Sequence, residues 1–321
     1  MWKLEAPLST VFRRRENDGE PVNDRRLRAA IAGGRITRIT RGVYVDAPGW
    51  RRLRPQARHA QLVWEAAART GSSLTFSHWA AAALHGIDIL GPWPSDIDVT
   101  IGATTGGRSG GTFPRHACRH EEEVETEPWG RHRITTALQT AVDLTASMRF
   151  VEAVAVADQA LWQRREGGAL VSTKALVDAA HSRTGRGSAR AARAADFAEP
   201  LSDSVRESHS RVLIHVMGFP PPELQARFTL SNGRSAFTDF FWREHRHIGE
   251  FDGVGKYRDP ELLRGRTAEE VLLAEKDRED ELRRQVSRFS RWRVPALDQP
   301  RLLFDILKAA GLPTTRPRPG R

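Results

Sequence analysis

The sequence predicts an α+β protein built from several domains. Its 321 residues are enough for two or three domains of ordinary size. Helical and strand-like apolar spacing alternate along the chain, and Pro200 follows a long arginine- and alanine-rich helical stretch. In residues 235–257 (SAFTDFFWREHRHIGEFDGVGKY), acids stand inside two apolar runs that a polar segment joins. These features predict three parts: an amino-terminal helix with a basic hairpin over residues 1–54, a central α/β region over 55–198 and a carboxy-terminal α/β domain over 199–321.

The composition favours a polyanionic partner and a reducing compartment. The formal net charge is +10, and residues 1–60 hold 14 Lys and Arg against 6 Asp and Glu. Such a basic segment is typical of nucleic-acid binding. The single cysteine, Cys118, excludes an intrachain disulfide and a multi-cysteine zinc site. We find no signal-type apolar core and no apolar run of membrane-spanning length, so we expect a cytoplasmic protein without a membrane partner.

The amino-terminal part combines a basic helix with a basic hairpin. Asn23 or Asp24 is a typical helix N-cap, and Gly33-Gly34 is a typical stop. Residues 35–45 (RITRITRGVYV) then predict a hairpin with its turn near Arg41-Gly42. This is the layout of a winged helix-turn-helix, in which the helix enters the major groove and the wing contacts phosphates; the alternative is a solvated helix and hairpin with another contact. The residues predicted to contact DNA are Arg25, Arg26, Arg28, Arg35, Arg38 and Arg41.

Three short motifs in this part resemble a known family. They are Asp24-Arg25-Arg26-Leu27-Arg28, Gly33-Gly34-Arg35-Ile36 and Arg41-Gly42-Val43-Tyr44. Together they resemble the amino-terminal winged domain of abortive-infection type IV antitoxins, the AbiEi family. The resemblance implies DNA binding, and it implies a toxin protein or a second copy of the chain as a further partner.

The central part is predicted to be an α/β region with several helices. We expect helices over residues 55–70, 77–84, 134–144 and 150–162, and within 170–198 with residues 185–188 (GRGS) as a start. His78 and His85 are interpreted as core or capping residues, and Asp143 as a cap or a local pairing partner. Several residues resemble the central domain of the same antitoxin-like proteins: Ser77-His78, Leu84-His85-Gly86, Thr136, Thr140, Asp143-Leu144 and Asp158-Gln159-Ala160-Leu161.

Two polar segments of the central part leave chemical alternatives open. Residues 95–101 (SDIDVTI) alternate as a strand, with Asp96 and Asp98 on one face. This pair fits either a magnesium-binding nucleotidyltransferase site or an edge strand with solvent-facing acids, although Pro92-Trp93-Pro94 replaces the glycine-serine pair that precedes such a site. A second cluster fits either a metal site or a polar strand that ends in acids: His116, Cys118, His120 and Glu121–Glu123.

The carboxy-terminal part is predicted as a helix, three strands, a helix, a strand and a helix. Ser202 or Ser204 can cap the first helix, and Gly218 ends it. Strands over residues 226–230 and 235–241 are joined by Asn232-Gly233, a strong hairpin signal, and the Glu250 strand follows. The remaining predicted elements are a charged helix over 267–291, a strand over 292–294 and a helix over 300–311.

Three acids of this part are expected to converge. Glu250 and Asp252 are two residues apart in a strand, so they share a face, and a hairpin would bring Asp239 beside them. Burying several carboxylates together normally implies a bound cation, a raised pKa or access to solvent.

The same part resembles a nuclease family. The stretch from Ser204 to Gln225, the acid Asp239 and Glu250-Phe251-Asp252-Gly253 resemble the restriction-endonuclease-like (PD-(D/E)XK) fold, specifically the very-short-patch repair endonucleases. The resemblance implies hydrolysis of DNA phosphodiester bonds with Mg²⁺ or Mn²⁺ as cofactor. Where the general motif has a lysine two residues after the glutamate, this chain has Asp252, as the repair-related subgroup does; Lys256 would replace that lysine in space. The implied catalytic residues are Glu207, Asp239, Glu250, Asp252 and Lys256, with Asp239, Glu250 and Asp252 as metal ligands.

Two functions follow from these observations. The first is a metal-dependent endonuclease of phage defence or DNA repair. The second is a DNA-binding transcriptional regulator of the type IV antitoxin kind, whose nuclease-like domain is not catalytic. Both predict DNA as the partner, and they differ in whether the carboxy-terminal acids perform chemistry.

Overall fold

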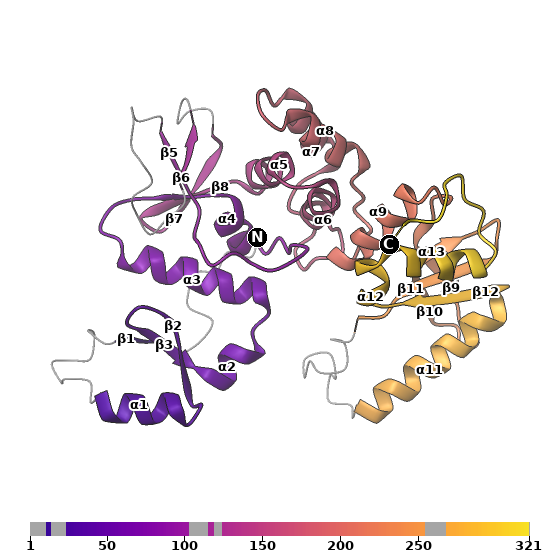
Figure 1. Cartoon of the computed structure of the whole chain (residues 1–321), viewed down its shortest axis with the longest axis horizontal. Helices are drawn as coiled ribbons and strands as arrows, with labels where there is room; N and C mark the ends of the chain where they lie inside the picture. Colours follow the sequence, from indigo (N-terminus) through magenta and orange to yellow (C-terminus); the bar gives the residue numbers. More distant parts are fainter. Residues whose placement is uncertain (1–10, 14–23, 103–114, 119–123, 254–267, 321) are drawn as a thin grey trace. The chain divides into compact units, whose positions relative to one another are not determined.

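The computed structural model of the chain describes residues 11–13, 24–102, 115–118, 124–253 and 268–320 (Figure 1). The chain divides into two compact units, one formed by residues 1–161 and 165–198 and the other by residues 162–164 and 199–321. Within the described ranges, none of the helices combines the length and the apolar character needed to cross a membrane.

The amino-terminal part of the first unit is a three-stranded antiparallel sheet with two helices. The sheet order is β1-β3-β2. The predicted helix and hairpin are both present, whereas β1, which pairs with β3, is too short for its apolar pattern to predict a strand. The elements in chain order are β1 (Val11–Arg13), α1 (Asp24–Ala32), β2 (Ile36–Thr40), β3 (Val43–Asp46) and α2 (Ala47–Arg52).

Helix α1 ends in the way that its two glycines predict. Gly34 has a φ of 67°, and its N–H donates to the Ile31 carbonyl at 3.0 Å. The Arg35 N–H donates to the Ala30 carbonyl, also at 3.0 Å. This pair of bonds is a Schellman motif, in which a left-handed residue satisfies the last helical carbonyls. The motif turns the chain directly into β2.

The middle of the first unit is a mixed five-stranded sheet in the order β6-β5-β4-β8-β7. Ala60, Val63 and Ala67 of α3 (Pro55–Arg69) pack with Phe76 and Ile134 of the sheet in one apolar core. The elements are α3 (Pro55–Arg69), β4 (Thr75–Phe76), α4 (His78–His85), β5 (Val99–Gly102), β6 (Arg115–Cys118), β7 (Thr126–Trp129) and β8 (His132–Thr135).

Four helices complete the first unit. They are α5 (Ala137–Ser147), α6 (Phe150–Leu161), α7 (Thr173–Ser182) and α8 (Ser188–Phe197). The prediction that α5 begins at Ile134 is wrong, because Ile134 is a buried residue of β8. Thr136 instead caps the helix, and its hydroxyl accepts the Gln139 N–H at 3.2 Å.

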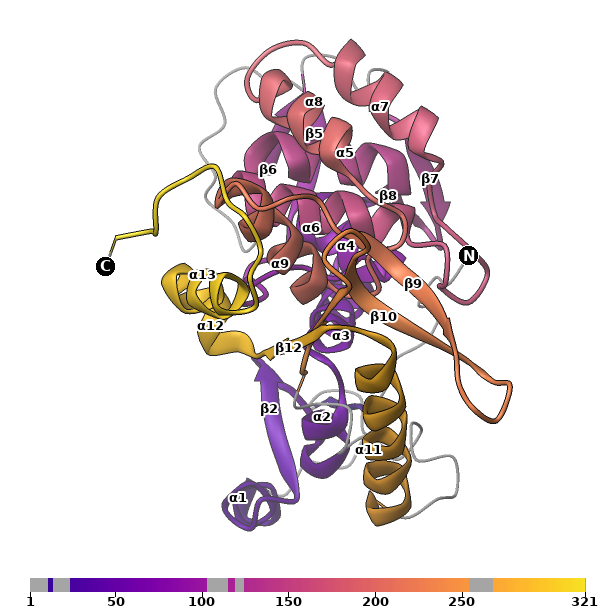
Figure 2. The same ribbon diagram turned by 90° about the vertical axis from the view of Figure 1, so that its right-hand side faces the viewer.

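The second unit follows the element order that the sequence predicts, with one additional short helix, α12 (Val294–Asp298), before the last helix. Its sheet runs β12-β11-β10-β9, with antiparallel pairs among β9, β10 and β11 and a parallel pair between β11 and β12. The elements are α9 (Val205–Val216), β9 (Glu223–Thr229), β10 (Ser235–Trp242), β11 (His247–Phe251), α11 (Ala268–Gln285), β12 (Arg288–Trp292), α12 (Val294–Asp298) and α13 (Pro300–Ala309). Figure 2 shows β9 and β10 continuing together as a long hairpin.

The last strand lies earlier in the chain than its sequence predicts. Helix α11 ends at Gln285 rather than near residue 291, and β12 covers Arg288 to Trp292 rather than residues 292–294. The backbone N–H groups of Ser287 and Arg288 donate to the Arg246 carbonyl, which fixes the start of β12 beside β11. Strand β12 contains charged residues, as the exposed face of a helix does. The apolar pattern alone therefore assigns these residues to the preceding helix.

Helices cover both faces of this sheet (Figure 1). On one face, residues of α9, α12 and α13 pack against Phe240, Trp242 and Trp292. On the other face, Leu282 of α11 packs against Phe241 and Ile248. Asp239 and Glu250, two of the acids discussed below, lie in β10 and β11, the two middle strands of this layered unit.

Candidate functional site

Strands β10 and β11 place Asp239 and Glu250 on the same face of the sheet. The register pairs Phe241 with Ile248, and alternation along each strand puts Asp239 with Phe241 and Glu250 with Ile248. This is the face on which α11 packs. Asp239 Oδ2 also accepts the Phe251 backbone N–H at 2.8 Å, so its carboxylate is fixed to the neighbouring strand.

Glu207 reaches this region from the first turn of α9. Ser204 caps the helix by accepting the Glu207 N–H at 3.2 Å, and its hydroxyl donates to Glu207 Oε1 at 2.8 Å. The Asp203 backbone N–H donates to Glu207 Oε2 at 2.9 Å. The side chain is held in one place by these bonds, at a residue that is only 9% exposed.

The charge state of Glu207 is unusual. Burial, and then the negative charge of Asp239, raise the pKa of Glu207 from its ordinary value of 4.5 to about 8. The hydrogen bonds from Ser204 and Asp203 favour the charged form, but they do not offset the two opposing effects. Burial and the charge of Asp239 thus favour the protonated form of Glu207, so the site disfavours two ionised carboxylates side by side.

Glu250 is neutralised by two arginines. Its carboxylate is buried, and Arg278 of α11 donates to Oε1 at 2.9 Å while Arg291 of β12 donates to Oε2 at 2.9 Å. Burial disfavours the charge of Arg278, but Glu250, Glu275 and Asp239 outweigh it and raise the pKa of this guanidinium. Burial likewise disfavours the charge of Arg291, but Glu250, Glu279 and Asp252 outweigh it and raise the pKa of that guanidinium. Each oxygen of Glu250 thus has a charged donor.

Asp252 is paired with a third arginine. It follows β11 as Arg293 follows β12, and the parallel register of Phe251 with Trp292 carries the two residues to the same end of the sheet. Arg293 donates to Asp252 Oδ2 through Nε at 2.8 Å and lies 2.6 Å from it through Nη2. Because Arg293 is largely exposed, this pair sits at the surface. Lys256 lies outside the described residues.

The fit of a divalent cation to these residues can be judged from their charge states. In the described part of the chain, no three or more His, Cys, Asp or Glu residues gather closely enough to hold a metal ion. Glu207 and Asp239 fit a cation, because their oxygen donors suit Mg²⁺ or Mn²⁺ and a positive charge would relieve their repulsion. Glu250 could join them only by exchanging Arg278 and Arg291 for the cation, and Asp252 only by leaving Arg293.

The amino-terminal arginines predicted to contact DNA are all at the surface. Arg25, Arg26 and Arg28 are exposed on α1, and Arg35, Arg38 and Arg41 are exposed in and around β2. The apolar residues of the hairpin, Val43 and Val45, are buried beneath them. The helix and the hairpin therefore present a basic surface on one small folded part.

The central acids of the transferase alternative do not form a pair. Strand β5 begins at Val99, so Asp96 and Asp98 precede it, and Asp96 is exposed whereas Asp98 is buried. The prediction of an edge strand is also wrong, because β5 lies between β4 and β6. Asp98 lies close to the buried His59, whose pKa falls to about 4 through burial despite this negative neighbour. Asp98 is thus part of the polar interior of the first unit.

His85 and Asp143 of the central part have hydrogen-bond partners that fit a structural role. His85 is buried and its Nε2 lies 2.7 Å from the Thr135 carbonyl. Asp143 accepts a hydrogen bond from Gln139, as its predicted local role requires, and a second one from Arg183, which is distant in the chain. Of the histidine and cysteine cluster, residues 115–118 form β6, whereas His120 and Glu121–Glu123 lie outside the described residues.

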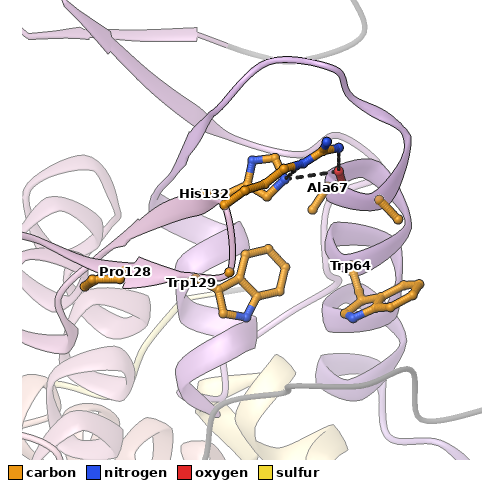
Figure 3. A pocket seen from close by; sticks show the side chains of 8 residues that line it. Trp64, Ala67, Pro128, Trp129 and His132 are labelled. Atoms are coloured by element: carbon orange, nitrogen blue, oxygen red, sulfur yellow. Dashed lines mark hydrogen bonds between the residues drawn. The ribbon is translucent and has the colours of Figure 1, made fainter.

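A hollow of about 680 Å³ lies elsewhere in the first unit, between α3 and the β7–β8 hairpin (Figure 3). Trp64 and Trp129 line it from the two sides. His132 Nδ1 accepts the Leu74 N–H at 3.2 Å, which leaves the ring proton on Nε2 to be donated to the Ala67 carbonyl at 3.1 Å. Arg131 also donates to the Ala67 carbonyl. These bonds attach the hairpin to the end of α3, which gives the polar wall of the hollow a structural role.

Sequence reasoning does not identify the three arginines of the second unit. Arg278 and Arg291 are 28 and 41 residues from Glu250 in the chain, so their pairing depends on the packing of α11 and on the register of β12. One signal is available: Arg291 and Arg293 flank a core tryptophan, and charged residues on both sides of a buried strand residue need partners.

Comparisons with known proteins support relatedness but no activity. No family model matches the chain. Two uncharacterised proteins of Mycobacterium tuberculosis, from strains CDC 1551/Oshkosh and H37Rv, are each 30% identical to the chain over 137 residues. The match covers 42% of this chain and 49% of each relative, so the chain spans about half the length of the curated relatives it matches.

Proposed function

We propose that this protein binds DNA through its amino-terminal helix and hairpin and hydrolyses phosphodiester bonds with a divalent cation held in its carboxy-terminal unit. The observation that carries the proposal is the combination of topology and acids in that unit. A helix, three strands, a helix and a parallel fourth strand follow one another, and the acids lie on the first helix and the two middle strands. The restriction-endonuclease-like resemblance implies both features.

The charge state of the acids supports a cation at this place. Burial, and then the negative charge of Asp239, disfavour an ionised Glu207, as its raised pKa indicates. Mg²⁺ or Mn²⁺ would be held by Asp239 and Glu207, with Glu250 and Asp252 as further oxygen ligands once their arginines are displaced. When bound, such a cation supplies an activated water and offsets the charge on the leaving oxygen. Hydrolysis then adds one water across a P–O bond and leaves a phosphate end and a hydroxyl end.

The residues of the chain would contribute binding and positioning. Asp239 is held by the Phe251 N–H and Glu207 by Ser204, so both carboxylates are already oriented before a substrate arrives. Glu207 carries a proton that it must release when a cation binds. The exposed arginines of α1 and β2 would attract and position the DNA.

The test is an incubation of the purified full chain with supercoiled plasmid and with single-stranded DNA, with Mg²⁺, Mn²⁺ or a chelator. We expect cleavage that depends on the cation and that Glu250→Gln abolishes. If the wild-type chain cuts none of these substrates with either cation, the hydrolase proposal is wrong.

A second candidate function is DNA binding without cleavage, as in a type IV antitoxin-like regulator. One observation favours it: Glu250 and Asp252, two of the expected ligands, are paired with arginines. In this case, DNA binding should depend on the amino-terminal arginines, no DNA form should be cut, and Glu250→Gln should leave DNA binding unchanged.

A further inference from the structure

Glu250 is held from two directions by side chains that also have other partners. Arg278 Nη1 lies 3.1 Å from Glu275 Oε1, and Arg291 Nη2 lies 3.0 Å from Glu279 Oε2. Glu275 and Glu279 are one turn apart on α11, so they lie on the same side of the helix. The result is a small network in which each arginine bridges Glu250 and an acid of α11.

Because each arginine also has an acid of α11 as a partner, losing Glu250 leaves neither guanidinium without a carboxylate. Leaving a buried arginine without any carboxylate would be costly, because its charge would be uncompensated. Here Arg278 would keep Glu275, and also its 2.6 Å bond to the Phe237 carbonyl. Arg291 would keep Glu279. Glu250 can therefore leave the network while both arginines keep an acidic partner.

The arginines are also placed to contact a phosphate. Their side chains are 24% and 26% exposed, whereas that of Glu250 is only 8% exposed, so solvent reaches the arginine side chains more readily than the carboxylate. A guanidinium that leaves a carboxylate has the planar donor geometry that a phosphodiester accepts.

We propose that Arg278 and Arg291 form a latch on Glu250 that a divalent cation opens, and that the opened arginines bind the phosphodiester substrate. The inference rests on the proposed hydrolase function, and it adds a regulation of that site. In the closed state, the arginines compete with the cation for Glu250. In the open state, Glu250 binds the cation, and Arg278 and Arg291 remain on α11 acids and turn to the phosphate. Cation and DNA binding are then coupled, and each strengthens the other.

The latch predicts that two kinds of substitution change the affinity for Mn²⁺ in opposite directions. Arg278→Gln or Arg291→Gln removes a competitor for Glu250, so Mn²⁺ should bind about tenfold more tightly in the absence of DNA. Glu279→Gln removes the alternative partner of Arg291, so Mn²⁺ should bind more weakly. Arg284→Gln is the matched control, because it removes the same charge from an exposed position of α11.

The experiment is isothermal titration of Mn²⁺ into the full chain and the four variants, without DNA. Circular dichroism of each variant checks its fold, and Arg291→Gln, on a partly exposed strand residue, keeps the test available if Arg278→Gln does not fold. The expected result is tighter Mn²⁺ binding by Arg278→Gln and by Arg291→Gln, and no change in Mn²⁺ affinity for Arg284→Gln. Equal affinities, an equal gain in Arg284→Gln, or no Mn²⁺ binding by any of these chains would overturn the latch.

The test separates this inference from the proposed hydrolase function. Mn²⁺ affinities that change as expected, without DNA cleavage by the wild-type chain, would support the latch and reject the hydrolase. Unchanged affinities in a chain that does cleave DNA would reject the latch alone.

Discussion

Glu250 and Arg291 are direct partners across the parallel strands β11 and β12, and Arg291 Nη2 donates to Glu250 Oε2 at 2.9 Å. The pairing puts a positive charge beside the acid that the hydrolase proposal needs as a cation ligand. Arg278 occupies the other oxygen of Glu250 from α11. Stability, charge state and the proposed activity of this unit therefore involve the same few side chains, and each dependence can be measured.

The ion pairs of Glu250 should contribute measurably to stability. Glu250→Ala leaves two partly buried guanidinium groups with fewer partners, so we expect a loss of about 1–3 kcal/mol in the free energy of unfolding. The measurement is urea denaturation of the full chain, monitored by far-ultraviolet circular dichroism. Glu223→Ala is the control, because it breaks an exposed pair with Arg243 and should cost at most about 1 kcal/mol. Equal losses in the two variants would contradict the buried network.

The raised pKa of Glu207 predicts a specific pH dependence of stability. The folded state keeps the proton of Glu207 up to about pH 8, whereas the unfolded chain releases it near the ordinary value of 4.5. The folded state therefore binds more protons between these values, and this contribution to stability is complete below pH 4.5 and is lost as the pH rises through 8. Its limiting slope is about 1.4 kcal/mol per pH unit.

Glu207→Gln should remove this contribution. We expect the stability of the wild-type chain, relative to this variant, to fall as the pH rises from 4.5 to 8 in metal-free buffer. Denaturation midpoints over this range give the comparison, with Glu223→Gln as a control on an exposed acid. Parallel curves for the wild type and Glu207→Gln would show that Glu207 ionises normally in the folded chain.

Close packing in the middle of the second unit should make Gly249 difficult to replace. A Cβ atom at this position would lie 2.6 Å from the Trp292 ring and 3.0 Å from the Trp242 ring. Because both rings are buried, Gly249→Ala should lower the free energy of unfolding by about 1–3 kcal/mol. Gly71→Ala serves as the control, since nothing lies within 4 Å of its added Cβ. A Gly249→Ala protein as stable as the wild type would contradict this packing.

The DNA-binding proposal predicts a salt-dependent role for the exposed arginines of α1. Replacing Arg25, Arg26 and Arg28 with Ala should weaken DNA binding and lower the slope of log affinity against log salt concentration by about one for each phosphate that the variant no longer neutralises. Fluorescence anisotropy with a labelled duplex at several salt concentrations measures both quantities. The charge-matched control replaces Arg186, Arg190 and Arg193, which are exposed near and on α8. If both triple variants bind as the wild type does, α1 is not the DNA-binding element.

Local sequence signals predict much of the fold. The glycines after α1, the Asn232-Gly233 turn and the Ser204 cap act over a few residues, and each is found where the sequence places it. Elements that depend on distant partners are misplaced. Strand β12 carries charges that its neighbours compensate, and Ile134 belongs to a strand because it pairs in the sheet rather than because of its local pattern.

The candidate site shows the same difference between local signals and contacts with distant partners. The spacing of Glu250 and Asp252 and the position of Asp239 in the preceding strand can be read from the sequence, as can Glu207 in the first turn of its helix. The partners of these acids cannot, because Arg278, Arg291 and Arg293 reach them through helix packing and strand register. The sequence therefore predicts on which elements of this unit the acids lie, and the structure is needed to see which of them are already neutralised.

The most direct measurement of the hydrolase proposal is the rate at which the full chain nicks supercoiled plasmid in Mn²⁺, compared with Asp239→Asn. Asp277→Asn, at an exposed position of α11, is the matched control. We predict nicking by the wild type and by Asp277→Asn, and a loss of about 100-fold or more in Asp239→Asn, because the cation loses a main ligand. Equal nicking rates in the wild type and Asp239→Asn, or no nicking by the wild type, would contradict the proposal.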